Sequence, residues 1–116
     1  MIAGIASALS GIQTGGKILS VGAHNIANAQ TEGFKRTRAL PVESSPGGVT
    51  VTLDKDVRPG PLFFSHEAPF LLREGSNVDL EKEIISNLQA VNFIEANIAS
   101  VRIQDKVLGS LLDITE

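Results

Sequence analysis

The sequence predicts a mainly α-helical chain: two long terminal helices form an antiparallel, coiled-coil-like hairpin, with a small β-rich insert between them. All five prolines lie between residues 41 and 69, so neither end contains a residue that would break a helix. Both ends repeat apolar residues at alternating three- and four-residue spacings, the pattern of a heptad seam. The predicted segments are a first helix with its turn (1–33), an insert (34–75) and a second helix (76–116).

The first helix is expected from Ile2 to about Asn28, a length of roughly 40 Å at 1.5 Å per residue. Lys17 is the only formally charged side chain between Met1 and Gln30. A surface helix normally carries charges opposite its apolar seam, so this helix is typical of one surrounded by other protein. The seam residues that we expect at an assembly interface are Ile5, Leu9, Ile12, Leu19 and Ile26.

A second stripe, made of small residues, follows roughly the opposite side of the first helix. Each interior glycine costs roughly 0.5–1 kcal/mol relative to alanine, so the helix is weak in isolation. The stripe would let a neighbouring helix approach almost backbone to backbone; the alternative is a frayed, glycine-rich terminus. Its members are Gly4, Ala8, Gly11, Gly15 and Gly22.

The insert is expected to contain short strands and turns. Phe34–Leu40 is the first candidate strand, and Val49–Leu53 alternates apolar residues with threonine, the period of a half-buried strand. We expect residues 54–56 to turn the chain and Leu62–Phe64 to form one more extended piece. The sequence leaves open whether these strands pair with one another or with a neighbouring molecule.

The second helix is expected from about Val78 to about Leu112, roughly 50 Å long. Ser76 and Asp79 resemble a loose capping box at its start. Its seam is predicted to pair with that of the first helix, and the seam residues expected at the assembly interface are Val91, Ile94, Ile98, Val101 and Leu108. A further stripe on another face consists of Phe93, Ala96, Ser100, Ile103, Val107 and Ile114. One partner helix cannot bury both stripes, so we expect other subunits to cover the rest.

No constellation of residues indicates catalysis, a cofactor or a metal site. His24 and His66 stand alone, and Asp54 and Asp56 lack the further oxygen ligands of a calcium loop. The chain contains no cysteine, which excludes disulfides and cysteine-based metal sites. We therefore expect a protein that is not an enzyme and that carries no cofactor.

Charge and hydropathy restrict the partners. The net charge of −3 argues against a nucleic-acid partner. Lys35, Arg36 and Arg38 form the only basic cluster, and we favour a solvated or subunit-facing strand over a phosphate site. No stretch approaches the roughly 20 apolar residues that span a bilayer, so no membrane insertion is expected. The N-terminus lacks the pattern of a cleavable signal peptide, so any export is expected to leave it uncut.

Two segments resemble the signatures of one known family. The first is Ser10–Gln13 together with His24–Arg36, which contains Asn-Ile-Ala-Asn followed by Thr, Gly, an aromatic and a basic residue. The second is Ser76–Glu83 with Phe93–Asn97. In order and position they resemble the N- and C-terminal signatures of bacterial flagellar axial proteins, the family of rod, hook and hook-associated subunits. Gly47–Val49, Arg58–Pro59 and the end of the chain look most like the small proximal-rod members, although the insert is shorter than expected for them.

The resemblance implies a structural subunit of the flagellar basal-body rod, the periplasm-spanning tube that transmits torque. Family members pass uncut through the flagellar export apparatus, and their terminal helices pack against other rod subunits and further copies of themselves. The residues that would set the turn from helix to insert are Asn25, Asn28, Thr31, Gly33 and Phe34. The alternative is a helical adaptor or an export-associated coiled-coil binding module.

Overall fold

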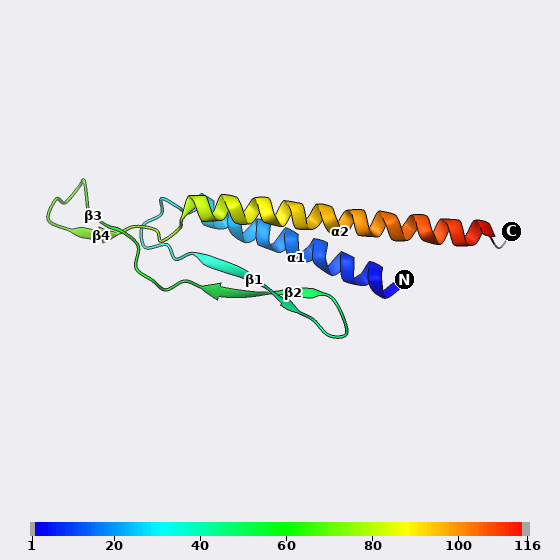
Figure 1. Ribbon diagram of the computed structural model, residues 1–116. Coiled ribbons are helices and arrows are strands. Elements are labelled where there is room, and N and C mark those ends of the chain that lie inside the picture. Colours follow the sequence, from blue (N-terminus) through cyan, green and yellow to red (C-terminus); the bar gives the residue numbers. More distant parts are fainter. Residues whose placement is uncertain (1, 115–116) are drawn as a thin grey trace.

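A computed structural model describes residues 2–114; residues 1, 115 and 116, which the predicted terminal segments include, lie outside the described part. Two long helices, α1 (Ile2–Ala27) and α2 (Leu80–Ile114), enclose an insert of four short strands in the chain order. The molecule is elongated, with extents of 81 × 23 × 15 Å (Figure 1). The predicted mainly helical fold with a small β-rich insert is confirmed.

The start of α2 differs from the prediction. Asp79 caps the helix, because its Oδ1 accepts a hydrogen bond from the backbone N–H of Lys82 at 3.3 Å. Ser76 Oγ instead accepts from the backbone N–H of Val78 at 3.2 Å. The capping box predicted at Ser76 is therefore wrong. An N-cap side chain satisfies free N–H groups of the first turn, so the helix begins after Asp79, at Leu80.

The insert forms two separate antiparallel hairpins. β1 (Thr37–Glu43) pairs with β2 (Val49–Lys55) along their whole length, and β3 (Leu62–Phe64) pairs with β4 (Leu72–Glu74). The turn predicted at residues 54–56 is wrong, because Asp54 and Lys55 complete β2. The strands thus pair with one another, and β4 is an element that the sequence did not predict.

The two hairpins lie in different places along the molecule. The β1–β2 hairpin runs beside α1 and contacts it through both strands. The β3–β4 hairpin projects beyond the start of α2, at the end of the molecule opposite to both termini (Figure 1). The insert therefore contributes one part that supports the helices and another that stands away from them.

The surface of α1 that faces α2 is the stripe of small residues. Leu9 and Ile26 of the predicted seam are 50% and 36% exposed, and Val91 on α2 is 40% exposed. The contact between the two helices therefore leaves much of these three side chains uncovered. Glycine lacks a Cβ, so side chains of α2 occupy the space above it and the bulkier seam stays outside. The facing pairs are Gly4 with Gln104, Gly11 with Asn97, Gly15 with Ile94, and Gly22 with Asn87.

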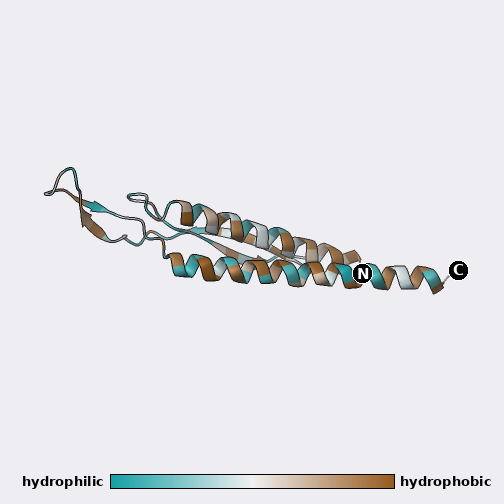
Figure 2. Cartoon of the chain, turned by 90° about the horizontal axis from the view of Figure 1, so that it is seen from above, coloured by the Kyte–Doolittle hydropathy of each residue, from teal (hydrophilic) through white to brown (hydrophobic). Residues whose placement is uncertain are grey.

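The apolar core is very small. Among the described residues other than glycine, Ala8 and Ala90 are the only apolar ones that are buried, whereas Asn25 and Glu83 are buried polar residues. Apolar side chains recur instead along both helices and over the β3–β4 hairpin (Figure 2). Neither helix in residues 2–114 is long and apolar enough to cross a membrane. Polar contacts therefore contribute much of what positions the elements.

Candidate functional site

The segment that follows α1 closes on itself through local hydrogen bonds. Asn28 Nδ2 donates to the carbonyl of His24 at 2.9 Å, and Thr31 Oγ1 donates to Asn28 Oδ1 at 3.2 Å. Gly33 follows with a φ of 65°, a left-handed conformation that glycine adopts without steric cost. The Phe34 ring then packs edge-on against the His24 ring, with centroids 5.5 Å apart. Together these contacts define the direction in which the chain leaves the helix.

Polar side chains of α1 hold the β1–β2 hairpin by its backbone. Asn25 Oδ1 accepts from the N–H of Thr37 at 3.0 Å, and Asn25 Nδ2 donates to the carbonyl of Thr37 at 2.7 Å. At the other end of the hairpin, the N–H of Val49 donates to Ser10 Oγ at 3.0 Å. Thr14 Oγ1 donates to the carbonyl of Val49 at 3.1 Å. Both ends of the hairpin are therefore attached to the helix.

The chain that leaves α1 and the chain that enters α2, distant in the sequence, meet directly after this turn. The N–H of Gly33 donates to the carbonyl of Glu74 at 2.8 Å, and the N–H of Asn77 donates to the carbonyl of Phe34 at 3.3 Å. The exit from α1 and the entry to α2 are thus joined by backbone hydrogen bonds. We call this region, residues 33–36 with residues 74–83, the junction.

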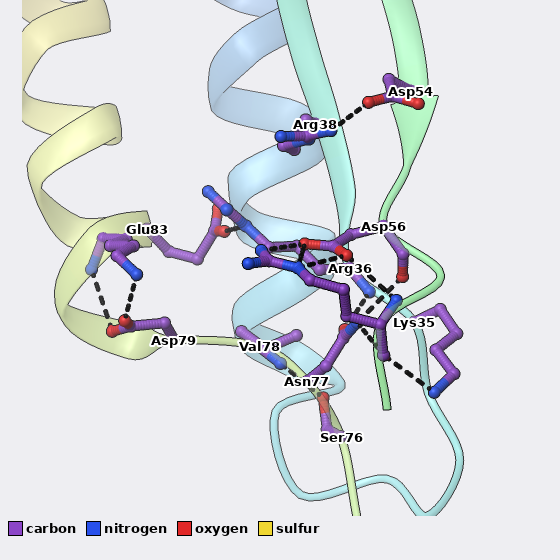
Figure 3. A network of polar contacts seen from close by, with 12 residues as sticks. Lys35, Arg36, Arg38, Asp54, Asp56, Ser76, Asn77, Val78, Asp79 and Glu83 are labelled. Carbon is purple, nitrogen blue, oxygen red and sulfur yellow. Dashed lines mark hydrogen bonds and ion pairs between the residues drawn. The ribbon is translucent and has the colours of Figure 1, made fainter. Parts of the chain in front are cut away.

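Asn77 is the centre of the junction (Figure 3). Its Oδ1 accepts from the N–H of Arg36 at 2.6 Å. Its Nδ2 donates to the carbonyls of Asp56 at 2.8 Å and Arg58 at 2.9 Å. One side-chain amide therefore connects the end of the first signature segment to the chain that leaves β2.

The basic cluster of the sequence is paired with acidic groups inside the chain. Glu83 on α2 is buried and accepts a hydrogen bond from Arg36 Nε, so this ion pair fastens the start of α2 to the junction. A buried carboxylate is costly unless it is paired, so both partners are needed together. The three ion pairs are Arg36 with Glu83, Lys35 with Glu74, and Arg38 with Asp54.

Hydrogen bonds keep two carboxyl groups beside the junction ionised. The side chain and the backbone N–H of Arg58 lower the pKa of Asp56 far below its ordinary value of 3.8. The Lys35 ammonium, and next the backbone N–H of Gly60, lower the pKa of Glu74 below its ordinary value of 4.5. These contacts are therefore fully formed at neutral pH.

The seam between the helices contains polar atoms without partners. Among residues 2–114, Asn87 Oδ1 and Gln104 Oε1 are buried and have no hydrogen bond. Both side chains lie above glycines of α1, at Gly22 and Gly4. A buried acceptor without a partner costs about 1–3 kcal/mol. The contact between α1 and α2 therefore fixes the register of the two helices more than it stabilises their pairing.

The residues predicted at the assembly interface are partly exposed and partly half-buried, and Ile94 also lies against Gly15 of α1. None of them is buried in the described chain: Leu9, Ile26 and Val91 are exposed, and the others are half-buried. The half-buried ones are Ile5, Ile12, Leu19, Ile94, Ile98, Val101 and Leu108. Every residue of the further stripe on α2, from Phe93 to Ile114, is exposed. These side chains are therefore available to other molecules.

Sequence reasoning missed the side chains that attach the insert to the helices. Ser10, Thr14 and Asn77 each bond to backbone groups at least 19 residues away, whereas the sequence predictions concerned local turns and apolar stripes. A signal was present at Thr14, because it is a polar residue beside Gly11 and Gly15 in the small-residue stripe. A polar side chain in a closely packed stripe has to find a hydrogen-bond partner.

The junction positions backbone segments, and six of its charged side chains form three ion pairs: Lys35 with Glu74, Arg36 with Glu83, and Lys82 with Asp79. Within the described residues there is no group of three histidine, aspartate or glutamate side chains placed to hold a metal ion. No model of a known protein family matches this chain, and no curated protein matches it.

Proposed function

We propose that this chain is a structural subunit of the bacterial flagellar basal-body rod. The observation that carries the proposal is the exposure of apolar side chains along two long helices that bury very few of their own. Soluble monomers rarely leave extended apolar surface in water, and such surface marks a site of protein association. A subunit whose helices are covered by neighbours in an assembly accounts for this surface.

The contact between the two signature segments also supports the proposal. The segments that resemble the N- and C-terminal signatures of flagellar axial proteins meet at the junction, where the N–H of Asn77 donates to the carbonyl of Phe34. Both ends of the chain resemble the same family, and they contact each other at the junction. A structural role for the whole chain in that family explains both observations.

We further propose that the helices form an antiparallel, coiled-coil-like hairpin. The order of the facing residues supports this arrangement, since Gly4 near the start of α1 lies against Gln104 while Gly22 lies against Asn87. The contact positions on α1 are seven, four and seven residues apart, and those on α2 are seven, three and seven apart, which fits the heptad spacing of a coiled coil. The paired helices would hold the apolar outer face of α1 at a fixed position relative to the apolar outer face of α2.

In this proposal the protein reaches the periplasm-spanning rod uncut, through the flagellar export apparatus. Its partners are other rod subunits and further copies of itself, and it transmits torque by rigid packing. It catalyses no reaction, carries no cofactor, and neither inserts into a membrane nor binds nucleic acid.

The proposal is tested by isolating detergent-extracted basal bodies from cells that produce the chain and quantifying it by mass spectrometry. Recovery in a constant ratio to other rod subunits is the expected result. Leu9→Asp, which places a charge on the outer face, should be absent from basal bodies, whereas the volume-conserving Leu9→Met should be retained. A folded wild-type chain that is missing from intact basal bodies would overturn the proposal and favour the helical adaptor.

A further inference from the structure

The β3–β4 hairpin ends in an exposed apolar tip. Phe70 in the loop is 99% exposed and Phe64 on β3 is 66% exposed. Leu62 and Leu72 on the same hairpin are also exposed, and the hairpin stands away from the helices (Figures 1 and 2). Burial of one such side chain is worth roughly 1.5–3 kcal/mol, so a projecting group of them is a strong candidate for contact with another molecule.

An apolar groove lies on the body of the molecule, where α1, α2 and the β1–β2 hairpin meet. Its volume is about 460 Å³, within the range of sites that enclose small organic molecules. No charged side chain lines it, and the polar residues of its lining are Ser86 and Gln89. The groove can therefore accept an aromatic ring without placing a charge in an apolar environment. The apolar residues that line it are Ile18, Ala39, Pro41, Val49, Ala90 and Phe93.

The tip and the groove of one molecule are far apart. α2 has 35 residues and is roughly 52 Å long, so about 30 Å of the 81 Å molecule lies beyond its ends. The tip occupies this extension, before the first residue of α2. Ala90, in the groove, lies ten residues into the helix, or roughly 15 Å from its start. A tip can therefore enter a groove only in a different molecule.

We propose that the Phe70 tip of one copy of this chain enters the groove of the next copy. The inference deepens the proposed function and rests on it, because it names a contact between copies in the rod. The two surfaces are different, so each copy uses its tip on one neighbour and its groove on another. Such head-to-tail contacts continue as an open helical array unless the rotation between copies closes a ring. Successive copies would be displaced by roughly 45 Å along their length.

A lipid surface fits the tip less well than a second copy does. The loop carries the acidic Glu67, and the one arginine of the hairpin, Arg73, is held by Glu32 at 2.8 Å. Anionic membranes attract uncompensated lysine and arginine, which the described residues of this hairpin do not provide. The uncharged lining of the groove, by contrast, complements apolar side chains.

The absence of cysteine from the chain makes disulfide trapping a clean test. We compare the purified full-length variants Phe70→Cys/Gln89→Cys and Phe70→Cys/Glu95→Cys under mild oxidation. Gln89 and Glu95 are both exposed on α2, but only Gln89 borders the groove. A disulfide needs Cα atoms within about 7 Å, so the expected product of the Gln89 pair is a ladder of linked copies. Equal ladders from both pairs, or equally efficient linking by Phe70→Cys alone, would overturn the proposal.

A second measurement keeps the test independent of cysteine chemistry. By sedimentation velocity, Phe70→Ser should lose the self-association of the wild-type chain, and Phe70→Leu should retain most of it, with unchanged helix content in both. Flotation of the wild-type chain with phosphatidylcholine–phosphatidylglycerol vesicles, lost in Phe70→Ser, would assign the tip to lipid and overturn the contact between copies.

The two proposals fail in distinguishable ways. Recovery of the wild-type chain in basal bodies together with no Gln89-specific ladder overturns the tip contact and leaves the rod assignment in place. A Gln89-specific ladder from a chain that is absent from basal bodies supports the tip contact and overturns the rod assignment.

Discussion

Asn25 forms hydrogen bonds with both backbone groups of Thr37, at 3.0 Å from the N–H and 2.7 Å to the carbonyl. An outer strand would make the same pair of bonds, so the side-chain amide of a helix replaces a strand at the edge of β1. Asn25 is 1% exposed, and water therefore cannot replace either bond. The relationship explains how a two-stranded hairpin, marginal by itself in water, stays in place beside α1.

Asn25→Asp should destabilise the chain by about 1–3 kcal/mol at neutral pH, since it removes the donor to Thr37 and leaves a buried carbonyl unpaired. The measurement is urea unfolding followed by far-ultraviolet circular dichroism. Asn92→Asp, at an exposed position of α2, is the matched control and should change the free energy of unfolding by less than about 0.5 kcal/mol. Equal losses in the two variants would contradict the role of Asn25.

Gly15 and Gly16 are adjacent, yet alanine should have opposite effects at the two positions. A Cβ at Gly15 would overlap the Ile94 side chain and lie 3.3 Å from the carbonyl oxygen of Ala90, whereas one at Gly16 would meet nothing within 4 Å. Gly16→Ala should stabilise the chain by about 0.5–1 kcal/mol through helix propensity. Gly15→Ala should destabilise it by about 1–3 kcal/mol through overpacking. The measurement is the thermal unfolding midpoint of both variants. Stabilisation by Gly15→Ala would show that this stripe does not face α2.

Ile98→Asp should abolish incorporation into the rod. Ile98 is half-buried in the single chain, and full burial of a charge against a neighbouring subunit would be strongly unfavourable. The check is the amount of the variant in isolated basal bodies, beside Ile98→Leu as the volume-conserving control. Normal rods containing Ile98→Asp would count heavily against an assembly interface on this face of α2.

Acid should loosen the chain around the junction. The pKa of Asp56 is lowered from 3.8 by hydrogen bonds from Arg58, and that of Glu74 is lowered from 4.5 by Lys35 and Gly60. A carboxyl group with a lowered pKa contributes stability above its unfolded-state pKa and loses it as the pH falls toward its folded-state pKa. The urea midpoint should therefore hold near neutral pH and decrease below about pH 4.5.

Asp56→Asn provides the control for this pH dependence. It removes one of the groups whose pKa is lowered, so the variant should be less stable than the wild type at neutral pH and should lose less stability on acidification. The measurement is the urea midpoint from about pH 7 to about pH 3 in both chains. An identical decrease in the two chains would show that Asp56 is not responsible.

The terminal helices could be predicted because a long segment without proline and with a helical apolar period can adopt few structures other than a helix. The face of α1 that meets α2 could not, because heptad reasoning selects the bulkiest stripe. Here glycine permits the closer approach, and Asn97 and Gln104, which count as interruptions in an apolar pattern, lie in the interface. β4 is three residues long, too short for a period to be visible.

The resemblance predicts a turn directly after α1. It does not predict which distant residues this turn contacts. Asn28, Thr31 and Gly33 act locally, within a few residues, and sequence order alone brings them together. Asn77 bonds across 41 residues to Arg36, and only the folded chain shows that these two meet. Long-range hydrogen bonds of this kind produce no regular residue spacing, so they cannot be predicted from a single sequence.

The polar side chains above the glycines of α1 also resist sliding. To shift by one turn, Asn87 would have to leave Gly22 and pass onto Ile18 or Asn25, while Asn97 and Gln104 cross their own neighbours in the same movement. At either new position Asn87 would meet a Cβ, which Gly22 does not have. The close fit of Asn87 above Gly22 therefore resists sliding of one helix along the other.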